Sequence, residues 1–192
     1  MGFVEFTKVQ KSYDGENLVV KDLNLSVGKG EFLTMLGPSG SGKTTCLMML
    51  AGFETATHGE ILLAGKPINN IPPHKRGIGM VFQHFSLFDA LNVGENIALG
   101  MENVLPQRDL AQRIREVSQA YGLPLDPNRI VGSLSAGERQ RVEIIRCLLQ
   151  NPKLLIMDEP TSVLTPQEVQ TLFATLRKLK SEGTSILYIS HK

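Results

Sequence analysis

The sequence predicts an α/β protein with a mostly parallel β-sheet, an antiparallel β part near the N-terminus and a helical block inserted in the chain. Short apolar runs separated by turn residues dominate residues 3–82, as is typical of strands. Between residues 93 and 150, apolar side chains recur at helical spacing with charges between them, which predicts amphipathic helices. Beyond residue 153, strand and helix patterns alternate, and this alternation favours a parallel sheet. With 192 residues and 42% hydrophobic content, the chain suits one domain with a real core.

The first part of the chain is expected to be rich in strands, because its apolar runs are short and are bounded by turn residues. The strands are expected at residues 3–9, 18–27, 32–36, 60–63 and 78–82. A helix is expected over residues 44–50, directly after a glycine-rich turn.

The later elements begin with the inserted helices. Helical spacing predicts these helices over residues 93–99, 110–121 and 137–150. Four consecutive apolar residues at 154–157 predict a buried strand, followed by a helix over 166–180 and a strand over 185–189. We therefore expect three parts: residues 1–83 as a β-subdomain with the first part of the core, 84–150 as a helical subdomain, and 151–192 as the second part of the core.

One glycine-rich stretch matches the pattern G-x-x-x-x-G-K-[ST] at every position. It reads Gly37-Pro38-Ser39-Gly40-Ser41-Gly42-Lys43-Thr44-Thr45. Glycines let successive backbone N–H groups turn onto phosphate oxygens, and the helix that follows adds its positive N-terminal end. Lys43 is expected to reach the β- and γ-phosphates and Thr44 to ligate Mg²⁺. The stretch predicts a P-loop NTPase with a RecA-like core; an ordinary glycine-rich turn between strand and helix is the alternative.

Two carboxylates, Asp158 and Glu159, stand at the end of the apolar run 154–157. Open α/β sheets gather their ligands at the carboxyl ends of the strands. Asp158 is therefore expected to hold Mg²⁺, and Glu159 to orient and deprotonate the water that attacks the γ-phosphate. Taken alone, the pair also fits a strand that ends in a solvated acidic turn.

A third pattern is the turn that opens the expected helix over 137–150. It reads Leu134-Ser135-Ala136-Gly137-Glu138. Its backbone N–H groups suit an anion, whereas a plain N-cap at Ser135 is the alternative interpretation.

Together these motifs resemble the ABC ATPase family over nearly the whole chain. The order is the P-loop, Gln83, the turn at 134–138, Asp158-Glu159-Pro160, the segment Ser162-Val163-Leu164-Thr165 and His191. In that family two ATPase domains face head to tail, and each ATP lies between one domain's P-loop and the other's signature turn. The resemblance thus implies ATP and Mg²⁺ as cofactors and a second ATPase domain as partner, either an identical chain or a tandem domain.

The same resemblance implies roles for single residues. Tyr13 would stack on adenine, Gln83 would sense Mg²⁺ beside Thr44 and Asp158 and link to the transporter, and His191 would contact the γ-phosphate. The signature residues that would face the ATP of the opposite protomer are Ser135, Ala136, Gly137 and Glu138. Without the family match, Tyr13 fits an exposed aromatic after a strand and His191 a terminal surface residue.

Three features depart from the family pattern. Ala136 stands where a second glycine is usual, and Glu138 where glutamine is usual, which predicts weaker ATP affinity at that half-site. Thr165 replaces the aspartate that usually ends its segment. The chain also stops one residue after His191, where family members run on, so we expect a truncated C-terminus.

The two parts of the chain resemble different importer ATPases. Residues 1–83 resemble those of polyamine-type importers, whereas residues 84–192 resemble those of simple-sugar and nucleoside importers. This difference suggests a recombinant chain with a junction near residues 83–85; drift within one family is the alternative.

The expected partners beyond ATP are transmembrane permease subunits. Lys+Arg 20 against Asp+Glu 19 gives a net charge of +1 without a basic run, so we expect no nucleic-acid partner. No apolar run approaches the ~18–20 residues of a membrane span, and the two cysteines suit a reducing compartment. We therefore expect a cytoplasmic chain, peripheral on the inner face of the cell membrane through its permeases, without direct membrane insertion.

The surface that meets the permease is expected just after Gln83, so that the second half of the chain selects the membrane subunit. An apolar cluster there comprises Phe85, Leu87, Phe88 and Leu91; the alternative places these residues in the core of the helical insert.

The function that follows is ATP hydrolysis that drives solute import through separate membrane subunits. The alternative is a truncated or chimeric fragment that binds ATP without productive turnover. A soluble ABC protein acting on ribosomes or DNA is disfavoured by the near-neutral charge.

Overall fold

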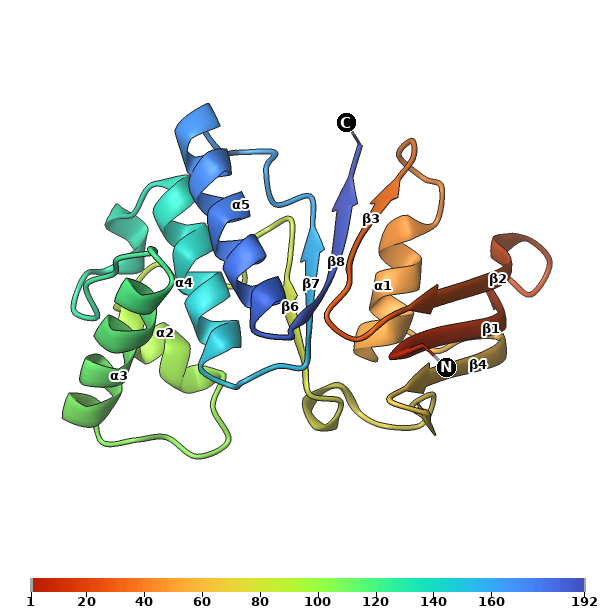
Figure 1. The fold of residues 1–192 in the computed structure, drawn as a ribbon, viewed down its shortest axis with the longest axis horizontal. Coiled ribbons are helices and arrows are strands. Elements are labelled where there is room, and N and C mark those ends of the chain that lie inside the picture. Colours follow the sequence, from red (N-terminus) through yellow and green to blue (C-terminus); the bar gives the residue numbers. More distant parts are fainter. Residues whose placement is uncertain (1, 192) are drawn as a thin grey trace.

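Two β-sheets with a helix between them form one side of the molecule, and four further helices form the other (Figure 1). A computed structural model describes residues 2–191; Met1 and Lys192, the outermost residues of the expected ranges 1–83 and 151–192, lie outside the described residues.

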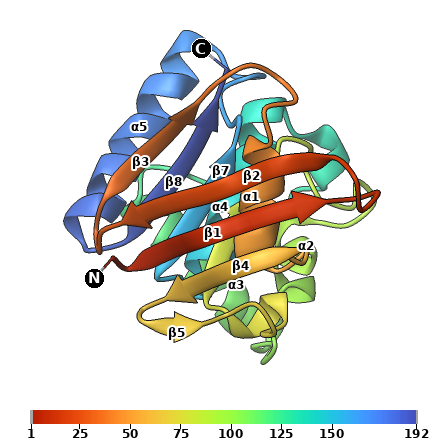
Figure 2. The same ribbon diagram turned by 90° about the vertical axis from the view of Figure 1, so that its right-hand side faces the viewer.

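The first sheet is antiparallel, with the strand order β2-β1-β4-β5. Its strands are β1 (Val4–Ser12), β2 (Leu18–Val27), β4 (His58–Leu63) and β5 (Lys66–Pro67). One face carries buried apolar residues such as Val4, Phe6 and Ile61, as expected for an antiparallel sheet that covers a core with one face. Figure 2 shows this sheet lying across α1 (Lys43–Ala51).

The second sheet is parallel, with the order β3-β8-β7-β6. Its strands are β3 (Phe32–Leu36), β6 (Ile78–Val81), β7 (Leu154–Asp158) and β8 (Ser185–Ser190). Every residue of β7 is buried, because both faces of a parallel sheet are covered. Leu154 and Ile156 pack toward α1 and the antiparallel sheet, whereas Leu155 and Met157 pack into the core of the four helices.

The four helices on that second face form the helical side of the molecule (Figure 1). They are α2 (Val93–Leu99), α3 (Gln107–Ala120), α4 (Ala136–Leu148) and α5 (Pro166–Ser181). Short 3₁₀ turns at Pro73–Lys75 and Val131–Ser133 connect elements.

The predicted α/β class with a parallel sheet, an antiparallel part and inserted helices is confirmed, and the differences are local. α4 ends at Leu148 rather than at residue 150, because Asn151 takes a left-handed φ of 49° before Pro152, and a residue that precedes proline disfavours the helical region. β5 was not predicted. It pairs with β4 through a turn at Ala64 and Gly65, whose φ values of 50° and 77° are both left-handed, as in the tightest hairpin turns.

Candidate nucleotide-binding site

The glycine-rich loop lies between the end of β3 and the start of α1. Gly40 and Gly42 have φ values of 78° and 84°, which residues with a side chain rarely adopt. A Cβ on Gly42 would also come within 2.9 Å of the Val19 carbonyl oxygen. Gly42 is the N-cap of α1 and supplies no side-chain bond to the first turn, so the N–H groups of that turn are suited to an anion.

Lys43 is buried within the curve of this loop. Its ammonium group donates to the carbonyl oxygens of Gly37 at 2.6 Å and Pro38 at 2.7 Å, and to Ser41 Oγ at 3.0 Å. The positive charge therefore lies where the loop would surround a phosphate chain, and phosphate oxygens suit this ammonium group as acceptors.

Asp158 ends β7 directly opposite the loop. The Thr44 hydroxyl lies 3.4 Å from Asp158 Oδ2, whereas Asp158 Oδ1 is buried without a hydrogen-bond partner. Burial and the neighbouring charge of Glu159 raise the pKa of Asp158. A buried acceptor without a donor is costly, and a hard cation such as Mg²⁺ would satisfy it.

The residues present fit Mg²⁺ in the way that nucleotide sites hold it. Residues 2–191 contain no group of three His, Cys, Asp or Glu that could hold a metal. Mg²⁺ commonly binds through one or two protein oxygens together with phosphates and waters. Asp158 and Thr44 supply these two oxygens.

Glu159 and His191 complete this edge of the parallel sheet. Glu159 has a left-handed φ of 50°. This conformation costs free energy in a non-glycine residue and is frequent at functional sites. Its backbone N–H donates to the Ile189 carbonyl at 3.1 Å, and its carboxylate lies against His191 Nε2. His191 Nδ1 lies 3.3 Å from the Gly37 carbonyl oxygen, so this histidine connects the glycine-rich loop to Glu159.

Two predicted residues lie at the margin of this group. Gln83 is exposed, two residues after the end of β6. Tyr13 is 60% exposed in the turn after β1, with the Lys11 ammonium 4.7 Å from its ring centroid. Because Val19 of the next strand lies against Gly42, the hairpin end that carries Tyr13 adjoins the glycine-rich loop.

The turn at residues 135–138 belongs to the helical side. Ser135 is the N-cap of α4, and it exchanges two hydrogen bonds with Glu138 in a capping box. The bond from the Ser135 N–H lowers the pKa of Glu138, and Arg129 pairs with the same carboxylate at 2.6 Å. Ser135 is thus a helix N-cap and the negative charge of Glu138 is paired rather than free; the role of this turn toward the ATP of an opposite protomer stays a prediction.

Sequence reasoning missed two residues near this turn, of which Glu168 contacts it. Glu168, in the first turn of α5, lies so close to Gly137 that a Cβ there would overlap its carboxylate. The Thr-x-x-Glu spacing of Thr165 and Glu168 is a capping-box pattern that could have revealed it. Gln140 is buried on α4, and its amide donates to the Pro160 carbonyl oxygen next to Glu159; no sequence pattern marks this contact.

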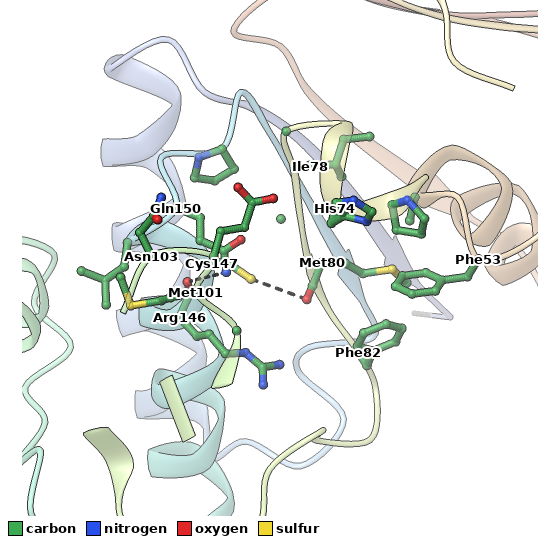
Figure 3. Close-up of a pocket in the computed structure, with 18 residues that line it drawn as sticks. Phe53, His74, Ile78, Met80, Phe82, Met101, Asn103, Arg146, Cys147 and Gln150 are labelled. Carbon is green, nitrogen blue, oxygen red and sulfur yellow. Dashed lines mark hydrogen bonds between the residues drawn. The ribbon is translucent and has the colours of Figure 1, made fainter. Parts of the chain in front are cut away.

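A cavity of about 690 Å³ opens between the α1 side and the helical side (Figure 3). Phe53 and Phe82, with ring centroids 5.7 Å apart, lie on one wall. Met101 and Arg146 lie on the other. The cavity is therefore built from both halves of the chain.

The apolar cluster predicted after Gln83 does not line this cavity. Leu87 packs against the core of the helical side, while Phe88 is 62% exposed. Phe85 and Leu91 are half-buried. The core alternative therefore fits Leu87, whereas Phe88 is exposed, and contact of this cluster with a membrane subunit stays a prediction.

Comparisons with known proteins agree with this geometry. Residues 20–162 match the family model described as ABC transporter. The spermidine/putrescine import ATP-binding protein PotA of Clostridium novyi is 40% identical over 98% of this chain, and that of Clostridium acetobutylicum is 42% identical over 98%. The chain spans 54% of the length of each of these relatives.

Solved structures show the same architecture. A dimeric ATP-binding cassette in a post-hydrolysis state, bound to ADP and Pi, superposes with a TM-score of 0.87 at 29% identity, covering 98% of this chain and 88% of the other. A nucleotide-free ATP-binding cassette from an ABC transporter gives 0.88 at 27% identity, covering 100% and 82%.

The expected junction near residues 83–85 finds no support. Each match to the two clostridial relatives runs over 190 residues and so includes both sides of the junction. Among the described residues, no helix has the length and apolar character needed to cross a membrane.

Proposed function

The chain belongs to the ABC transporter family of ATP-binding domains, and on that premise we propose that it hydrolyses ATP to drive import through separate membrane subunits. The observation that carries this proposal is the meeting of Lys43, Asp158 and the Glu159–His191 pair at one edge of the parallel sheet. Phosphoryl transfer depends on positioning and on charge neutralisation, and these groups supply both.

The residues divide the chemistry among them. The N–H groups of the glycine-rich loop and Lys43 hold the β- and γ-phosphates, and Thr44 and Asp158 would hold Mg²⁺, which neutralises phosphate charge when bound. Glu159 accepts a proton from a water molecule whose oxygen bonds to the γ-phosphorus, while the bond from that phosphorus to the β–γ bridging oxygen breaks. His191 donates to the γ-phosphate, and Gln83 reaches the same site from the end of β6.

We propose that a second ATPase domain completes each site. Ser135, Ala136, Gly137 and Glu138 open α4 on the helical side, where they suit the ATP of an opposite protomer. The dimeric cassette bound to ADP and Pi supports this arrangement, with Tyr13 against the adenine of its own protomer.

The proposed membrane partner is a permease pair, with this chain on the inner face of the membrane. The cavity with Phe53 and Phe82 on one wall offers an apolar seat for a permease segment. Relatives named for spermidine and putrescine import make polyamines the solute class to test.

The decisive experiment is the solution mass of Glu159→Gln by light scattering, with and without MgATP. Loss of the proposed base should leave ATP bound without turnover, so we expect a dimer only with MgATP. Nucleotide bound without a change in mass would favour a fragment that binds ATP without productive turnover.

One further variant tests nucleotide binding, and a second is a control. Lys43→Ala should abolish tight ATP binding, because it removes the buried ammonium from the loop; unchanged ATP affinity would reject the site. Glu116→Gln removes an exposed carboxylate on α3. It should behave as the unmodified chain, and it is the control for the loss of a glutamate charge in Glu159→Gln.

A further inference from the structure

The loop that follows Gln83 is held to the helical side by an unusual pair of side chains. Glu143 of α4 is fully buried and accepts the Ser86 backbone N–H at 2.8 Å. Arg146, one turn further along α4, pairs with Glu143 and donates to the Ser86 carbonyl oxygen at 3.2 Å. Both backbone polar groups of Ser86 are thus bound by α4; we name this arrangement the Ser86 clasp.

A second attachment lies two residues further on. Asn96 of α2 accepts the Phe88 N–H at 2.7 Å and donates to the Phe88 carbonyl at 3.0 Å. Residues 86 and 88 are therefore fixed to two helices, whereas β6 fixes the chain to the parallel sheet as far as Val81. Gln83 lies in the short segment between these attachments, so its position depends on where Ser86 is held.

Stability alone is a weak explanation for the clasp. Burial raises the pKa of Glu143, which shows that the site is unfavourable for a charge. A buried ion pair is often no more stabilising than apolar residues of similar size. The specific contribution of Glu143 and Arg146 is to fix a backbone segment, because their polar atoms match the N–H and C=O of Ser86.

The clasp also adjoins the cavity. Arg146 lies on the cavity wall (Figure 3), so the guanidinium that binds the Ser86 carbonyl also faces the cavity.

We propose that Glu143 and Arg146 are positioning residues that set the placement of Gln83 relative to the Mg²⁺ and γ-phosphate site. This inference rests on the proposed function of Gln83 in ATP hydrolysis. The clasp makes the segment after Gln83 part of the helical side, so that a movement of α4 relative to the parallel sheet displaces Gln83.

The first test is amide hydrogen exchange at Ser86. Glu143→Met keeps the side-chain length but removes the acceptor, and we expect exchange at Ser86 to rise about tenfold or more, as for the loss of one charge-assisted hydrogen bond. Glu143→Gln keeps an acceptor oxygen and should restore part of the protection. Glu116→Met, at an exposed glutamate with an Arg three residues away on α3, is the matched control and should leave Ser86 unchanged. Unchanged exchange in Glu143→Met would overturn the clasp.

The second test is a double-mutant cycle with Gln83→Ala, read by ATP turnover. If Glu143 acts through Gln83, Glu143→Met should lower kcat about tenfold in the unmodified chain and have little effect in Gln83→Ala. Equal losses in both backgrounds would mean that Glu143 does not act through Gln83 and would overturn the proposal.

The double-mutant cycle still tests the proposal if a variant does not fold or if the unmodified chain does not hydrolyse ATP. Should Glu143→Met not fold, the same cycle is run with Glu143→Gln and Arg146→Lys, whose geometry is closer to the original. Should the unmodified chain bind ATP but not hydrolyse it, the proposed function fails separately, and the cycle is read by Mg²⁺-dependent nucleotide affinity. Additive effects on that affinity would again reject the positioning role.

Discussion

Substituting Gly137 by alanine tests the contact between the turn at residues 135–138 and the start of α5. A Cβ at Gly137 would overlap the Glu168 carboxylate, which accepts both the N–H and the hydroxyl of Thr165 at 2.9 Å. Moving that carboxylate aside should cost the two hydrogen bonds that it accepts from Thr165, about 1 kcal/mol. Alanine regains up to about 0.5–1 kcal/mol of helix propensity over glycine, so the net change in the unmodified chain should be small.

The same substitution should behave differently once Glu168 is absent. In a Glu168→Ala background the overlap disappears, and Gly137→Ala should stabilise the chain by up to about 0.5–1 kcal/mol. The coupling free energy is therefore about 1 kcal/mol, equivalent to about 2–4 °C in Tm for a domain of this size.

Equilibrium urea unfolding without nucleotide, followed by circular dichroism, measures all four members of this cycle. Gly94→Ala is the matched control, because Gly94 occupies the same second position of α2, and a Cβ there would approach no heavy atom closer than 3.3 Å. An equal effect of Gly137→Ala with and without Glu168 would refute the contact.

Three further changes have defined outcomes. Asp158→Asn should raise Tm by a few degrees without nucleotide, because it removes a buried charge next to Glu159, and should abolish the added stabilisation by MgATP in thermal denaturation. Arg76→Met should cost about 3 kcal/mol or more in urea unfolding, since it leaves the Met49 and Leu50 carbonyls at the end of α1 without donors; exposed Lys75→Met should cost little. The Ser135 N–H lowers the pKa of Glu138 below 4.5. The stabilisation from this carboxylate is therefore present above pH 4.5 and is lost as pH falls through the lowered pKa. Glu138→Gln, which can keep the cap, should lose less unfolding free energy below pH 4.5 than the unmodified chain loses.

Local patterns in the chain were sufficient to predict most of the fold. The buried run at 154–157 and the helical spacing at 166–180 lie within one residue of β7 and α5. The glycine-rich loop was predicted from its own spacing, and Asp158-Glu159 from their place at the end of a buried strand beside that loop. These features depend on residues close together in the chain.

Contacts between segments that are distant in the chain could not be predicted from the sequence patterns. The bond from Gln140 to Pro160 and the attachment of Ser86 to Glu143 join residues that are 20 and 57 positions apart. Both depend on how α4 packs against its neighbours, and periodicity specifies a buried face but not the partner of a polar group on it. Glu143 is fully buried, but its neighbours three and four positions away on the helix include Arg139, Gln140 and Arg146, so the helical pattern did not mark it as a buried residue.

The departures from the family pattern acquire a common physical explanation in the structure. Glu138 caps α4 through Ser135 and is paired with Arg129, while Thr165 caps α5 through Glu168. Glu138 and Thr165 thus each contribute to a helix start, and the negative charge of Glu138 is paired with Arg129. Because Glu168 also lies against Gly137, the two caps meet. A shift at the start of α5 would therefore act on the turn at residues 135–138 by direct contact between the two neighbouring caps.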